Sequence, residues 1–82
     1  MTEANNDRLT KIEDHLARTD CYIAENEERI FRQKATIAER ARTGRDTTEA
    51  SKVLLTMCDT LTVMRGHREI LLCQRSPRAF KP

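Results

Sequence analysis

The sequence predicts an all-α fold, an antiparallel two-helix hairpin of the coiled-coil type that dimerises into a four-helix bundle. Two features of the 82 residues support this prediction. Apolar residues recur every seven positions, which is the period of packed helices and not the alternation of strands. A short breaker at 44–46 separates two long segments that contain no proline. We therefore expect one helix over residues 7–43 and a second helix over residues 47–74.

The first helix is predicted by an apolar row that repeats every seven residues: Leu9, Leu16, Ile23, Ile30 and Ile37. The positions three residues further on are mostly polar and include Thr19, Asn26 and Gln33. We expect this polar row to fix the register of the packed helices at some cost in stability. A second row, Ala17, Ala24, Phe31 and Ala38, widens the apolar face. Residues 1–6 precede the apolar row, and we expect them to be disordered.

The turn is predicted by Gly44, which follows a segment with Arg40 and Arg42 in its last turn, as a left-handed cap at a helix C-terminus does. Asp46 and Glu49 stand three residues apart and predict a carboxylate form of the capping box. Pro77 prevents the second helix from continuing, so we expect 76–82 to be a flexible basic tail. The second helix carries its own apolar seam, with Leu54, Met57, Leu61, Met64 and Leu71.

A turn this short forces the two helices to lie antiparallel. Folding about Arg45 pairs residues whose numbers sum to about 91, if the helices meet level with each other. Ile37 then meets Leu54, Ile30 meets Leu61, and Ala41 meets Ala50. Residues 1–30 carry a net charge of −4 and residues 31–82 a net charge of +6, so the same register sets acidic side chains beside Arg65, Arg68, Arg75 and Arg78. The charge asymmetry is therefore expected to align the two arms.

A hairpin of this size rarely buries enough apolar surface to be stable alone. We expect its seams to pack against a partner, either a second copy of the chain or a helix of another protein. The residues predicted to form this interface are Leu9, Leu16, Ile23, Ile30, Ile37, Leu54, Met57, Leu61, Met64 and Leu71.

Several short stretches resemble a set of short, uncharacterised bacterial proteins with a predicted helical hairpin. The stretches are His15-Leu16-Ala17, Tyr22-Ile23-Ala24-Glu25, Glu28-Arg29-Ile30, Arg32-Gln33, Ile37, Gly44-x-Asp46-Thr47-x-x-Ala50 and Leu54-Leu55. The resemblance covers roughly residues 12 to 73, and its most specific element is the turn-and-cap motif that begins at Gly44. It implies a helical hairpin in a bacterial cytoplasm, with no activity and no catalytic residues to transfer.

No motif for chemistry is visible, so we expect no catalytic residue, no cofactor and no metal site. Two histidines, His15 and His67, and three cysteines, Cys21, Cys58 and Cys73, are the candidate ligands, and none stands at a metal-binding spacing. The hairpin register places Cys21 and Cys73 near the same level, which leaves a disulfide or a shared metal open. An odd number of cysteines favours reduced thiols in the cytoplasm.

The function expected from these features is protein–protein interaction or self-association without enzymatic activity. The alternative is a small nucleic-acid-binding regulator, because basic residues collect at both ends of the hairpin. The possible phosphate contacts are Arg40, Arg42, Arg45, Arg75, Arg78 and Lys81. No apolar run approaches the length of a membrane span, and no secretory signal is visible at the N-terminus.

Overall fold

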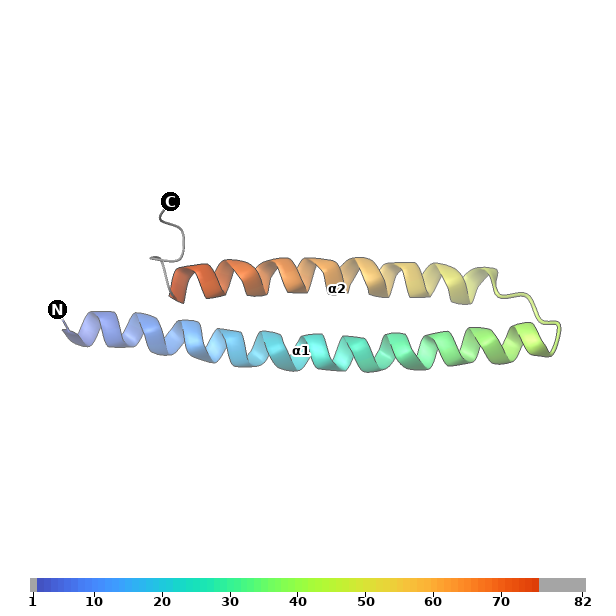
Figure 1. The fold of residues 1–82 in the computed structure, drawn as a ribbon, viewed down its shortest axis with the longest axis horizontal. Helices are drawn as coiled ribbons and strands as arrows, with labels where there is room; N and C mark the ends of the chain where they lie inside the picture. The colour runs from blue at the N-terminus through green and yellow to red at the C-terminus, as the bar shows by residue number, and fades with distance from the viewer. Residues whose placement is uncertain (1, 76–82) are drawn as a thin grey trace.

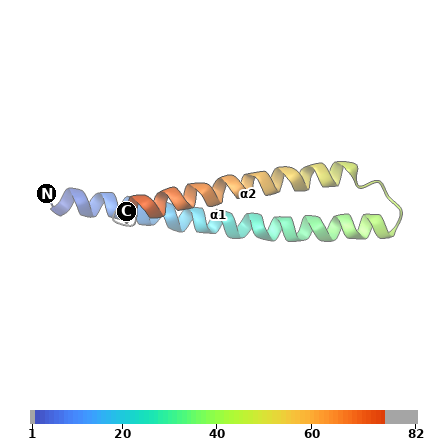
Figure 2. The same cartoon turned by 45° about the horizontal axis from the view of Figure 1, so that its top comes forward.

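The computed structural model describes residues 2–75, with side chains from residue 7 onward, as two α-helices joined by a short turn (Figure 1). Helix α1 is Thr2–Arg42 and helix α2 is Thr48–Arg75. They lie antiparallel, with extents of 64 × 27 × 13 Å. In Figure 2 they overlap near the chain termini and lie side by side near the turn, so the helices cross at an angle. The predicted all-α hairpin is confirmed.

The ends of the helices differ from the expected ones mainly at the N-terminus. Helix α1 begins at Thr2, so residues 2–6 are helical and the expected disorder there is wrong. No glycine or proline precedes Gly44, and Glu3 and Ala4 favour helix, so nothing in this segment stops the helix. The other ends lie within one residue of the expected positions. The expected tail, 76–82, lies outside the described residues.

Gly44 closes α1 as the sequence predicts. Its φ is 75°, the left-handed conformation that favours glycine. The N–H of Gly44 donates to the carbonyl of Ala41 at 3.1 Å, and the N–H of Arg45 donates to the carbonyl of Arg40 at 2.8 Å. These two bonds form a Schellman motif, which satisfies carbonyl groups that the helix end leaves free.

The start of α2 differs from the expected capping box. The carboxylate of Asp46 accepts hydrogen bonds from the N–H of Thr48 at 3.0 Å and from its hydroxyl at 2.7 Å. Helix α2 begins at Thr48, so Asp46 lies just before the capping position and forms an Asx turn. Glu49 pairs instead with Lys52 at 3.6 Å, and its negative charge still favours the helix N-terminus. The Thr48 hydroxyl and N–H bonds lower the pKa of Asp46.

The core is a single seam between the two helices. Its buried residues follow the heptad positions of both helices: Ile12, Leu16, Thr19, Asn26 and Ile30 on α1, and Ala50, Leu61 and Leu71 on α2. No described side chain in it is less than 2% exposed. Ile12, Leu16 and Leu71 cluster near the chain termini, with Leu72 packed against them. The seam is thus one layer deep and open at both sides.

Averaged over the contacting pairs, the register differs from the predicted one by roughly one helical turn. The contacting pairs across the hairpin have residue numbers that sum to between 82 for His15 with His67 and 92 for Glu27 with Arg65. Ala41, expected to meet Ala50, is exposed. Ala50 is buried and accepts a hydrogen bond from Gln33. The prediction placed the turn tightly about Arg45, whereas residues 43–47 are non-helical and let α2 shift along α1.

Candidate interaction surface

The polar row of α1 lies within the seam and contacts α2, as its heptad position predicts. The amide of Asn26 donates to the sulfur of Met64 at 3.0 Å, and the amide of Gln33 donates to the carbonyl of Ala50 at 2.8 Å. Thr19 is buried in the same row. A shift of register would take these polar groups away from their partners, so the contacts favour one alignment of the helices.

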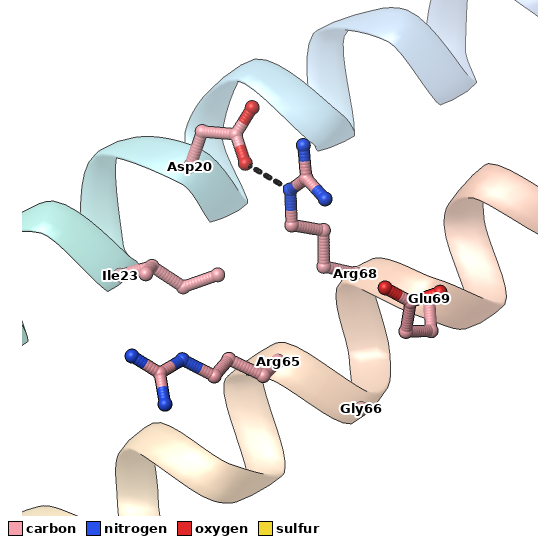
Figure 3. Close-up of a pocket in the computed structure, with 6 residues that line it drawn as sticks. All are labelled: Asp20, Ile23, Arg65, Gly66, Arg68 and Glu69. Atoms are coloured by element: carbon pink, nitrogen blue, oxygen red, sulfur yellow. Dashed lines mark hydrogen bonds and ion pairs between the residues drawn. The ribbon is translucent and has the colours of Figure 1, made fainter.

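A row of ion pairs follows one side of the seam and defines what we call the ion-pair face. Glu13 pairs with Arg75 at 3.2 Å, and Glu27 pairs with Arg65 at 2.9 Å. Between them, Asp20 pairs with Arg68 at 2.5 Å, the bond drawn in Figure 3. These pairs confirm that the acidic segment lies beside arginines of α2. All of them are solvent-exposed and contribute little stability each, about 0–1 kcal/mol, but together they disfavour other alignments.

Most residues predicted for the partner interface lie in the seam within the hairpin. Leu16, Ile30, Leu61 and Leu71 are buried there. A second set is only half-buried, because one neighbouring helix cannot cover it: Ile23, Ile37, Leu54, Met57 and Met64. Leu9 is 43% exposed. The seam residues therefore pack mainly between α1 and α2, and only the open sides of the seam remain accessible to a partner.

Large apolar side chains remain exposed outside the seam. Phe31 is 64% exposed on α1 and Leu55 is 66% exposed on α2. Val63 and Ile70 are 70% and 57% exposed. Successive helical residues turn by about 100°. Val63 and Ile70 therefore point directly away from α1, on the outer edge of α2, since the buried Leu61 points towards α1.

Phe31 and Leu55 lie on the ion-pair face, where it continues towards the turn. On α1, residues four apart share a face, and Ala17, Ala24 and Phe31 each follow an acidic member of the ion-pair row by four positions. On α2, Leu55 precedes Gly66 by eleven residues, which is close to three full turns. Gly66 lines a groove on this face together with Asp20, Ile23, Arg65, Arg68 and Glu69 (Figure 3). The numbers of Phe31 and Leu55 sum to 86, within the observed register, so the two are level.

The ion-pair face is also the face on which small residues gather. The row Ala17, Ala24 and Ala38, predicted to widen the apolar face of α1, is exposed and is not covered by α2. Gly66 lies within α2, which continues through it to Arg75. A Cβ added at Gly66 would meet no atom within 4 Å. The backbones of both helices are thus accessible from this side.

The described arginines predicted to contact phosphate lie at the two ends of the hairpin. Arg42 pairs with Glu39 beside the turn, and Arg75 pairs with Glu13 at the other end of the hairpin. Arg40 and Arg45 are exposed near the turn. Arg78 and Lys81 lie outside the described residues. The four described members of this set show no arrangement beyond helix capping and surface pairing.

The histidines and cysteines that could bind a metal ion pair differently in the structure from what the sequence predicts. Cys21, Cys58 and Cys73 are free thiols, so no disulfide joins Cys21 to Cys73. His15 and His67, which no sequence spacing connects, meet across the helices with their Nε2 atoms 3.2 Å apart. Within residues described by the structure, no group of three or more His, Cys, Asp or Glu side chains is placed to hold a metal ion.

No protein-family model, curated protein or solved structure matches this chain. The resemblance to bacterial helical hairpins therefore remains an expectation from the sequence. Within residues 2–75, neither helix has a stretch that is both long and apolar enough to cross a membrane.

Proposed function

We propose that this chain is a self-association module, in which two hairpins pack through their ion-pair faces to form a four-helix bundle. The observation that carries the proposal is the exposure of Phe31 and Leu55, which are 64% and 66% exposed. Helix geometry and the register place the two level with each other on the ion-pair face. Aromatic and aliphatic side chains exposed together in this way are typical anchors of protein interfaces.

The open side of the seam also supports the ion-pair face as the contact surface. Ile23 lines the groove of the ion-pair face and is only half-buried, so a second layer of helices would complete its burial. The row Ala17, Ala24 and Ala38, together with Gly66, lets another backbone come close. Arg65, Arg68 and Arg75 on this face already pair with carboxylates of α1 within each hairpin, so two copies bring three neutralised pairs each to the contact.

The test compares three lysine substitutions that add the same charge. Phe31→Lys and Leu55→Lys remove the proposed anchors, and Val63→Lys changes a similarly exposed side chain on the outer edge of α2. A twofold interface carries each substitution twice. Burying one such side chain contributes about 1.5–3 kcal/mol, so each anchor variant should weaken the dimer by at least about 3 kcal/mol, or roughly a hundredfold.

Sedimentation equilibrium and circular dichroism would be measured on all three variants and on the unchanged chain. We expect Phe31→Lys and Leu55→Lys to dissociate the dimer and Val63→Lys to leave it intact. If only Val63→Lys dissociates it, the outer edge of α2 is the contact surface and the proposed face is wrong. If the unchanged chain is a helical monomer at every concentration, self-association itself is wrong.

A further inference from the structure

The face opposite the ion pairs carries two histidines that the fold brings together. His15 lies on α1 and His67 on α2, and 52 positions separate them in the sequence. Their Nε2 atoms are 3.2 Å apart, and the ring centroids are 4.8 Å apart with an interplanar angle of 62°. Both side chains are solvent-exposed. We propose that His15 and His67 form a two-point binding site for a divalent transition-metal ion of the Zn²⁺ or Ni²⁺ type.

The separation of the two nitrogens suits a shared ion. Zinc binds imidazole nitrogen at about 2.0–2.1 Å with tetrahedral angles, which puts two such nitrogens about 3.4 Å apart. The observed 3.2 Å needs only a small side-chain adjustment to reach this value. The centroids are only 1.6 Å further apart than the nitrogens, so the rings are inclined to the line between those nitrogens. This inclination lets both lone pairs be directed at a point beside that line.

The chemistry of the pair also suits such an ion. Neutral imidazole is the commonest protein ligand for Zn²⁺ and Ni²⁺. An ion on both Nε2 atoms requires each ring to carry its proton on Nδ1, where water can accept the hydrogen bond because the rings are exposed. The hydrogen bond between the two Nε2 atoms is then replaced by two metal bonds. No third His, Cys, Asp or Glu joins the pair among the described residues, so water completes the coordination.

The position of the pair links metal binding to folding. The two rings come together only when α2 packs on α1, so the ion binds the folded hairpin and stabilises it as its concentration rises. The site lies on the face opposite the ion pairs, and it therefore does not depend on the proposed self-association. Each proposal can fail without the other.

The test is titration of the full chain with Ni²⁺, followed by calorimetry and by the thermal midpoint of the helical circular dichroism signal. We expect one ion per chain and a midpoint that rises with Ni²⁺. His15→Ala and His67→Ala should each lower the affinity by more than about tenfold, because loss of even an outer-shell partner of a metal ligand costs about 10–100-fold. Cys21→Ser is the matched control on the same helix, and it should bind Ni²⁺ as the unchanged chain does.

A second measurement, nuclear magnetic resonance of the histidine rings, needs no substituted chain. In the unchanged chain titrated with Zn²⁺, the ring resonances of both histidines should shift together at the same ratio of metal to protein. The proposal is wrong if only one ring responds, if either histidine variant keeps the full affinity, if Cys21→Ser abolishes binding, or if Ni²⁺ leaves the thermal midpoint unchanged.

Discussion

Replacing Asn26 with leucine should stabilise the hairpin. Asn26 is 8% exposed in the seam, and its amide donates to the sulfur of Met64. A thioether is a weak acceptor, so little is lost with this bond. Burying a leucine there contributes about 1.5–3 kcal/mol, and fitting its extra volume costs about 1–3 kcal/mol in a tight core and less in an open one. Met64 and Ile23 are only half-buried and leave room to adjust.

We therefore expect a net gain of about 1–2 kcal/mol, with the relief of a buried polar group included. For a domain of this size each 1 kcal/mol moves the thermal midpoint by about 4–8 °C, so the midpoint should rise by roughly 5–15 °C at fixed protein concentration. Circular dichroism melting and urea denaturation measure it. Gln33→Leu is the control: it loses a 2.8 Å bond to a backbone carbonyl, so its gain should be smaller. A lower midpoint for Asn26→Leu would refute the placement of this residue in the interhelical seam.

Two further predictions concern the glycines and the helix start. An added Cβ meets nothing within 4 Å at either Gly44 or Gly66 in the single hairpin, yet Gly44→Ala should cost about 1–2 kcal/mol because φ is +75° there. At protein concentrations too low for association, Gly66→Ala should instead gain about 1 kcal/mol from helix propensity. Chemical denaturation of both variants measures the difference, and the same sign for both would contradict the backbone assignment. The pKa of Asp46 is lowered by its bonds to Thr48, so the stability it adds is present above the ordinary carboxyl pKa and is lost as the pH falls through the lowered value. Asp46→Asn should flatten the acid side of the stability profile. A profile identical to that of the unchanged chain would show that this Asx turn has no part in acid unfolding.

The parts of the fold that the sequence predicts are those set by local rules. The seven-residue row from Leu16 to Ile37 fixes which side of α1 faces its neighbour, and Gly44 fixes where α1 ends. The charge asymmetry predicts the pairing of acidic residues with Arg65, Arg68 and Arg75. Each of these follows from spacing or charge alone, because helix geometry turns sequence positions into faces.

The details that the sequence does not predict depend on how the two helices slide and cross. The loop of residues 43–47 is long enough to allow more than one register, and a shift of one turn moves Ala41 out of the seam. The same shift and crossing bring His15 to His67, although their spacing carries no ligand motif. The exposure of Phe31 likewise depends on how α2 is placed against α1. It is part of an apolar row in the sequence, but the row lies beside the seam and not within it.

The concentration dependence of the thermal midpoint tests most directly whether a second hairpin completes this one-layer core. Helical circular dichroism would be followed on the unchanged chain over a hundredfold range of protein concentration, without added metal. If the hairpin is completed by a second copy, the midpoint rises with concentration, because association stabilises the folded state by mass action. A single cooperative transition whose midpoint stays constant over that range would show that the lone hairpin is stable and would contradict the account.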